Sequence, residues 1–246
     1  MLVLGMLLFA VAGCKHGSGD KPLITEGERL ATKGEGAVPA CASCHGEKGE
    51  GNGAAGFPRL AGLNKDYLAK QLQDMAREKP PEGVVMEPVA RDYSKTPRVN
   101  SDLTAFSPGL RHSPVMSPLA RGLSEQQINA VSAYYASLSF TAKPLPADFQ
   151  TLERGADLAL RGKPEYGLPA CISCHAPNGE GFGADFPPLA GQPPKYLIDQ
   201  IDKWQTGERD NDPLALMKAV ANQLTDADKI NAAAYFANRT LVVKGQ

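Results

Sequence analysis

The 246-residue sequence lacks an excess of either charge, since its 26 Lys and Arg residues are balanced by 27 Asp and Glu residues. A nucleic-acid-binding protein needs a basic face, so we expect no nucleic-acid partner. The apolar opening at residues 2–12 is too short for a hydrocarbon core that takes about 20 helical residues. Strand patterns are almost absent. The sequence therefore points to a helical protein without a membrane-spanning opening.

The apolar opening is typical of a secretory signal peptide and ends at an isolated cysteine. Residues Val11-Ala12-Gly13-Cys14 resemble a bacterial lipobox, in which the cysteine is lipidated. No Lys or Arg precedes the run, which departs from that pattern, and a buried free cysteine is the alternative. Lys15 favours the outer membrane. We expect residues 1–23 to form a lipoprotein signal peptide and tether, which anchors the protein on the periplasmic side of a bacterial membrane.

The rest of the chain consists of two copies of one module, which predicts a tandem two-domain architecture. Three segments recur in the same order: residues 38–53 as 168–183, 57–72 as 186–201, and 116–135 as 217–236. The distance between copies falls after the second pair, which indicates an insertion of about 28 residues near 80–113. We expect two domains, at 24–140 and 152–246. A proline-containing linker at 141–151 joins them.

Each copy shows three helical segments. We expect them at residues 24–31, 65–78 and from Ser124 in the first copy, and at 152–159, 194–207 and from Thr225 in the second. Ser124 and Thr225 have the spacing of capping boxes. Gly27 and Gly155 mark a close crossing of the first and last helices. Such short helices bury little apolar surface, so a large apolar group is expected in each core.

The cysteine motifs suggest what that group is. The sequences CASCH and CISCH match the attachment motif for c-type haem, with these residues: Cys41, Cys44, His45, Cys171, Cys174 and His175. Two thiols on one helical turn can form thioethers to the two vinyl groups, and the histidine then reaches the iron. A disulfide, a redox-active thiol pair and half of a zinc site are the alternatives. The repetition in matched flanks favours two covalently bound haem c groups with their iron.

The second axial ligand is expected to be methionine. Met116 and Met217 hold the same register before the capped last helix of each copy. The second copy has no other methionine after its motif, whereas Met75, Met86 and His112 compete in the first. Packing in the core is the alternative role for both methionines. A thioether opposite an imidazole stabilises ferrous iron and raises its potential.

These motifs, with FPRLAG at 57–62 and FPPLAG at 186–191, resemble class I cytochrome c domains. The pair resembles the two-domain di-haem cytochromes of the c-four type over nearly all of the chain after Cys14. The resemblance implies an all-α fold of two tandem cytochrome c-like domains, each wrapped around one haem. It also implies that the carbonyls of Pro58 and Pro187 accept the Nδ1 protons of the haem-binding histidines.

Two further matched pairs are candidates for holding haem propionates: Arg111 with Arg209, and Tyr67 with Tyr196. A guanidinium or a phenol can neutralise or hydrogen-bond a propionate. Surface charges and core aromatics are the alternative roles. Each tyrosine also precedes a glutamine by four residues.

Iron held by histidine and methionine has no open position, which favours an electron carrier over a stand-alone enzyme. The expected redox partners are a dehydrogenase or quinol-oxidising complex and a terminal oxidase or reductase. The alternative is a catalytic or electron-accepting cytochrome subunit of a dehydrogenase, such as one that oxidises thiosulfate. The insertion is too rich in proline for a long helix. We hypothesise that it covers the first haem's edge or docks a partner.

Overall fold

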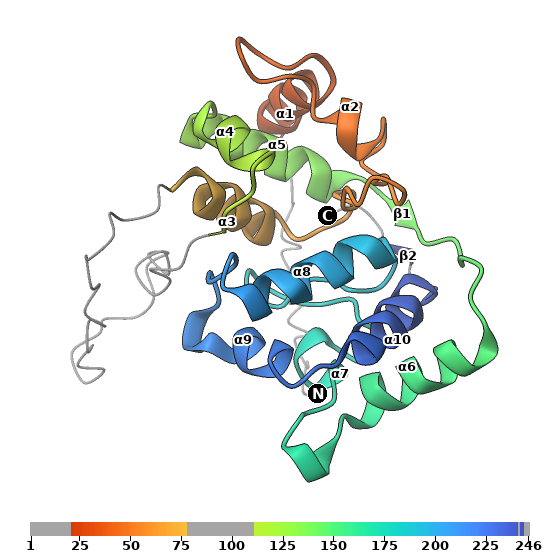
Figure 1. Cartoon of the computed structure of the whole chain (residues 1–246). Helices are drawn as coiled ribbons and strands as arrows, with labels where there is room; N and C mark the ends of the chain where they lie inside the picture. The colour runs from red at the N-terminus through yellow and green to blue at the C-terminus, as the bar shows by residue number, and fades with distance from the viewer. Residues whose placement is uncertain (1–20, 78–110, 241, 244–246) are drawn as a thin grey trace, which may run out of the picture.

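A computed structural model describes residues 21–77, 111–240 and 242–243 (Figure 1). Cys14, Met86 and most of the expected insertion lie outside these residues. Within them, no helix combines the length and the apolar character needed to cross a bilayer. The fold is helical throughout apart from one short pair of strands.

Each half of the chain folds into its own helical bundle (Figure 1). The first domain contains α1 (Lys21–Lys33), α2 (Ala42–His45), α3 (Lys65–Ala76), α4 (Met116–Arg121) and α5 (Glu125–Ser137). The second contains α6 (Phe149–Arg161), η3 (Pro164–Tyr166), α7 (Ile172–His175), α8 (Pro194–Thr206), η4 (Pro213–Ala215), α9 (Leu216–Ala221) and α10 (Asp226–Ala237). Strands β1 (Phe140–Thr141) and β2 (Val242–Val243) pair antiparallel and tie the end of the chain to the start of the linker.

The last helix of each domain begins at the capping box that its sequence predicts. Ser124 Oγ accepts from the Gln127 N–H at 3.2 Å, and Gln127 Oε1 accepts from the Ser124 N–H at 2.8 Å. Thr225 and Asp228 make the same reciprocal pair ahead of α10. Helix α6 starts at Phe149, inside the expected linker, because the Asp148 carboxylate accepts from the Thr151 N–H at 2.9 Å and caps it.

Glycine allows the first and last helices of each domain to cross closely. A Cβ added to Gly27 in α1 would lie 2.0 Å from the carbonyl oxygen of Ala130 in α5. One added to Gly155 in α6 would lie 2.1 Å from that of Asn231 in α10. No other residue leaves the two backbones room to pack at this distance, so α1 packs on α5 and α6 on α10.

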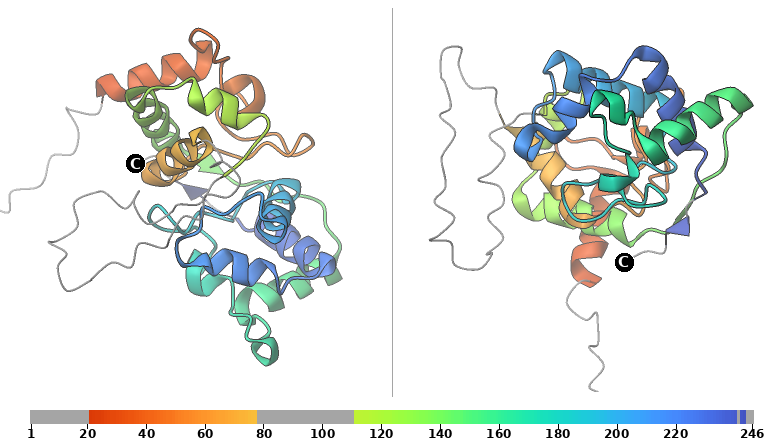
Figure 2. Two further views of the ribbon diagram at one scale, coloured as in Figure 1. Left: turned by 60° about the vertical axis from the view of Figure 1, so that its left-hand side comes forward. Right: turned by 90° about the horizontal axis from the view of Figure 1, so that it is seen from below.

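The two bundles lie one against the other, with α3 and α8 at the junction (Figures 1 and 2). Arg59 is fully buried there and donates across the domains to the Ala190 carbonyl at 3.0 Å. Its guanidinium carbon lies 4.5 Å from the Phe140 ring centroid. The Gln192 side chain pairs with both backbone groups of Arg59, at 3.0 and 3.1 Å. Burial lowers the pKa of Arg59 to about 10. The hydrogen bonds of Arg59 and Gln192 show that the junction is built from specific polar contacts.

Candidate functional site

Each domain encloses an apolar cavity at the position where its sequence predicts a large group. The first cavity has a volume of about 340 Å³ and the second about 360 Å³. Both are lined by the cysteines and histidine of the local CxxCH motif, by the Phe-Pro loop and by the candidate methionine. The two cavities meet at the domain junction, because Tyr67, Tyr196, Gln71 and Gln200 line both.

The histidine of each CxxCH motif is held by the same kind of contact in both domains. His45 ends the short helix α2, and its Nδ1 lies 3.0 Å from the carbonyl oxygen of Pro58. His175 ends α7, with Nδ1 at 2.9 Å from the Pro187 carbonyl. These are the contacts that the family resemblance implied. Because a carbonyl only accepts, Nδ1 carries the proton and Nε2 keeps its lone pair.

Burial keeps these imidazoles neutral. It lowers the pKa of both His45 and His175, and the carbonyl contacts offset only part of this effect. A neutral imidazole with Nδ1 protonated offers Nε2 as a ligand for a metal. The geometry and the protonation state both suit an axial iron ligand.

The four cysteines of the two motifs are free thiols in the structure, so neither motif forms a disulfide. Burial raises the pKa of Cys41, and it raises that of Cys171 to about 11. A redox-active pair works through a cysteine whose pKa is lowered. The environment of these two thiols is therefore the opposite of the one a thioredoxin-like pair needs.

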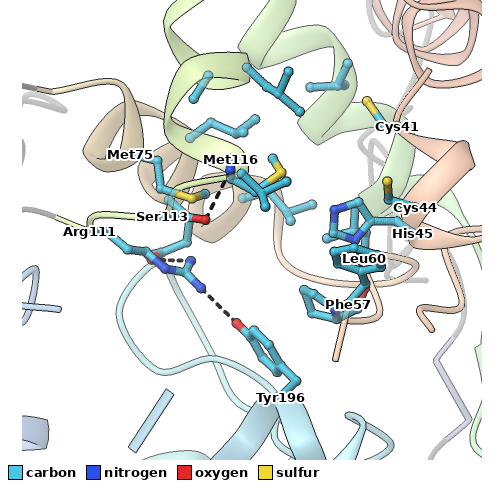
Figure 3. Close-up of a pocket in the computed structure, with 18 of the residues that line it drawn as sticks. Cys41, Cys44, His45, Phe57, Leu60, Met75, Arg111, Ser113, Met116 and Tyr196 are labelled. Carbon is cyan, nitrogen blue, oxygen red and sulfur yellow. Dashed lines mark hydrogen bonds between the residues drawn. The ribbon is translucent and has the colours of Figure 1, made fainter. Parts of the chain in front are cut away.

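The candidate methionines line the same cavities as the histidines. Met116 begins α4 and points into the first cavity toward His45 (Figure 3). Met217 lies in the first turn of α9 and lines the second cavity. Among the competitors, Met75 also lines the first cavity from α3, and His112 lies exposed at its rim.

The candidate propionate residues meet between the domains, although the sequence places one arginine and one tyrosine in each copy. Arg111 donates to the phenol of Tyr196 at 2.9 Å (Figure 3). It also donates to Gln200 at 3.0 Å, and both partners belong to the second domain. It also donates to Gln71 at 2.8 Å. Arg209 donates to Gln200 at 3.1 Å and to Gln71 at 3.3 Å. The two pairs form one cluster that both cavities share.

The sequence did not predict part of this cluster. Gln71, Gln200 and Asn211 each accept a hydrogen bond from an arginine. The glutamines carry a signal, because each stands four residues after a matched tyrosine and hence one helical turn away. Asn211 has no such signal: its side chain accepts from Arg209 and donates to Gln71 and Asp74 of the other domain.

The cluster has more positive than negative charge. Burial, and next the charge of Arg111, lower the pKa of Arg209. The pKa of Tyr67 is raised mainly by burial. Burial alone would raise the pKa of Tyr196 as well, but the charges of Arg111 and Arg209 together lower it. Asp74 is a buried carboxylate of this region, and Lys70 holds it at 2.8 Å. Arginines placed side by side and phenol donors suit an anionic group such as a carboxylate.

The residues of each cavity fit a covalently attached haem. Two thiols, a neutral imidazole and a thioether line each cavity, and the enclosed surface is apolar. The cationic cluster at the junction suits the propionates. This donor set is that of a c-type haem with histidine and methionine ligands.

Comparisons with known proteins agree with this fit. The family model for cytochrome c matches residues 24–139 and 159–239. The chain is 39% identical to the thiosulfate dehydrogenase electron acceptor of Stutzerimonas stutzeri strain A1501, over 87% of this chain and 86% of that protein. It is 33% identical to the cytochrome c4 of Stutzerimonas stutzeri, over 93% of each.

A solved structure adds a further relative. The thiosulfate dehydrogenase of Marichromatium purpuratum is 40% identical, with a TM-score of 0.69. The match covers 88% of this chain but only 40% of that chain. The similarity therefore extends to a two-domain portion of the larger protein.

Proposed function

Because this chain belongs to the cytochrome c family and carries two covalently bound haem c groups for electron transfer, we propose that it accepts electrons from a thiosulfate dehydrogenase. The observation that carries the proposal is a comparison between two proteins of one species. The chain is 39% identical to the acceptor of Stutzerimonas stutzeri and 33% identical to the cytochrome c4 of that species. Similarity to a thiosulfate dehydrogenase of Marichromatium purpuratum supports the same partner.

The protein's part in this function is to hold two haems and to fix their ligands. Bound haem iron supplies one-electron chemistry between its ferric and ferrous states. Cys41 and Cys44 would attach the first haem, and Cys171 and Cys174 the second. His45 and Met116 would bind the iron in the first domain. His175 and Met217 would bind it in the second.

The Phe-Pro loops position the histidines. The Pro58 carbonyl accepts the Nδ1 proton of His45 at 3.0 Å, and Pro187 does the same for His175 at 2.9 Å. Such a contact fixes the ring orientation and makes Nε2 a better donor to iron. Iron bound by both a histidine and a methionine would have no open position, which suits electron acceptance rather than substrate chemistry.

The junction cluster holds the propionates. Arg111 and Arg209 supply the positive charge, and Tyr67 and Tyr196 supply phenol donors. The two arginines donate hydrogen bonds across the domain junction. The two tyrosines line both cavities. These residues would neutralise and hydrogen-bond the propionates of both haems.

The protein works on the periplasmic side of a bacterial membrane. The support is the short apolar opening with Val11-Ala12-Gly13-Cys14 at its end. A lipid on Cys14 would anchor the protein, and Lys15 favours the outer membrane. The anchor would hold the cytochrome near membrane-bound redox partners.

Rapid mixing with a thiosulfate dehydrogenase from the same organism tests the proposed partner. The oxidised cytochrome is mixed with enzyme and thiosulfate, and haem reduction is followed optically. We expect full reduction of both haems, at least tenfold faster than for the organism's own cytochrome c4 under the same conditions. Equal or slower reduction would favour a general carrier between a quinol-oxidising complex and an oxidase or reductase.

A further inference from the structure

The backbone of each candidate methionine ligand is capped by a side chain, and the caps differ between the domains. In the first domain, Ser113 Oγ accepts from the Met116 N–H at 3.1 Å. In the second, the Asp212 carboxylate accepts from the N–H groups of Met217 and Lys218, the latter at 3.1 Å. The caps have the same structural role, but Asp212 brings a negative charge to the ligand and Ser113 does not.

The loop of the second domain is built to place this carboxylate. Arg209 and Met217 are separated by a longer segment than Arg111 and Met116, and the added residues form the turn η4. Leu214 and Ala215 adopt left-handed backbone conformations there, with φ of 67° and 53°. Such conformations are strained for residues other than glycine and persist only where the surroundings fix them. The position of Asp212 is therefore a fixed feature of the fold.

Backbone N–H groups hold the charge of Asp212. It is partly buried, and burial is the main reason that its pKa is raised, although Lys218, Met217, Arg209 and Lys70 act against this. Over the described part of the chain no ion pair engages its carboxylate. The nearby ammonium of Lys218 lies 3.9 Å from Asp210 instead. A charge in such a place is weakly screened and acts strongly on its neighbours.

We propose that the Asp212 carboxylate lowers the midpoint potential of the second haem, a control that the first domain lacks because its cap is the neutral Ser113. A fixed negative charge beside the ligand favours ferric iron, which carries one more positive charge than ferrous iron. The inference rests on the proposed ligation of the second haem by Met217. It makes Asp212 a positioning and tuning residue, not a ligand.

The test is a potentiometric titration of Asp212→Asn in the full-length holoprotein. Asparagine keeps an oxygen that can accept from Met217 and Lys218, so the cap survives while the charge is lost. We expect an upward shift of the second haem's midpoint, an unchanged first midpoint, and an unchanged charge-transfer band of methionine-ligated ferric haem. The reciprocal Ser113→Asp should shift the first midpoint downward.

Asp210→Asn is the matched control. It removes the same charge two residues away, from a side chain that is 55% exposed, and should move neither midpoint measurably. Each midpoint is assigned in a Met116→His background, in which the first haem's potential falls because histidine replaces the thioether. The wave that stays high then belongs to the second haem.

Three results would overturn the inference: no shift in Asp212→Asn, an equal shift of both haems, or loss of the methionine band in that variant. The last would make Asp212 a scaffold only. Failure of the ligand assignment is seen separately, since Met217→Ala would then leave the methionine band of both haems intact.

Discussion

The guanidinium of Arg111, in the first domain, donates a hydrogen bond to the phenol oxygen of Tyr196, in the second, at 2.9 Å. The same guanidinium reaches Gln200 in α8 and Gln71 in α3. One side chain thus bonds to residues that line both cavities. The residues proposed to hold the haem propionates also hold the domains together.

Replacing Arg111 by methionine should weaken the protein and change its redox properties. The variant loses three hydrogen bonds from a charged donor, each worth about 1.5–3 kcal/mol, so we expect the free energy of unfolding to fall by at least about 2 kcal/mol. Removal of the positive charge should lower the first haem's midpoint. Urea unfolding and potentiometry measure the two effects. Arg121→Met, at an exposed site in α4, should change neither, and equal behaviour of both variants would contradict the cluster's role.

Gly27→Ala should destabilise the first domain. The new Cβ would meet the Ala130 carbonyl at 2.0 Å, and α1 and α5 would have to separate. Overpacking of this kind costs about 1–3 kcal/mol. Thermal unfolding of the holoprotein measures it. The control is Gly53→Ala, whose Cβ would have no neighbour closer than 3.9 Å, and an unchanged Tm in Gly27→Ala would disprove the close crossing.

Alanine at Met116 or at Met217 should remove the methionine ligand of one haem and leave the other intact. Each variant should lose about half of the charge-transfer band of methionine-ligated ferric haem, and the affected midpoint should fall. Met75→Leu keeps the volume of a side chain that also lines the first cavity, and should retain the full band. If instead Met75→Leu loses half of the band, Met75 is the ligand in the first domain.

Cys14→Ser should release the protein from the membrane without altering its haem spectrum. Stable anchoring takes more than one acyl chain, as a bacterial lipoprotein carries. Fractionation of cells that express each form, with spectra of the soluble and membrane fractions, measures the outcome. Membrane retention of the variant equal to that of the native protein would reject the lipid anchor.

Local features of the sequence predicted much of the fold. Ser124 and Thr225 start their helices as their capping boxes indicate, and the repeated CxxCH motif places His45 and His175 on matched short helices. These features depend on neighbours within a few residues, and the repeat supplies each observation twice.

Contacts between the domains could not be predicted in this way. Arg59 is buried against Phe140 and Ala190, but its counterpart in the second copy is Pro188, so the repeat gives no hint of its role. Arg111 and Tyr196 were singled out as separate propionate ligands because nothing in the sequence says how the two domains dock. The charged cap at Asp212 was missed because its loop is longer than the one that precedes Met116.

The intact mass of the purified protein, with a variant that loses one attachment site, tests the account most directly. We predict a mass excess of two haem units that acid-acetone extraction does not remove, and of one unit in Cys41→Ser combined with Cys44→Ser. A native protein that carries one haem, or haem that extraction removes from both domains, would contradict the account.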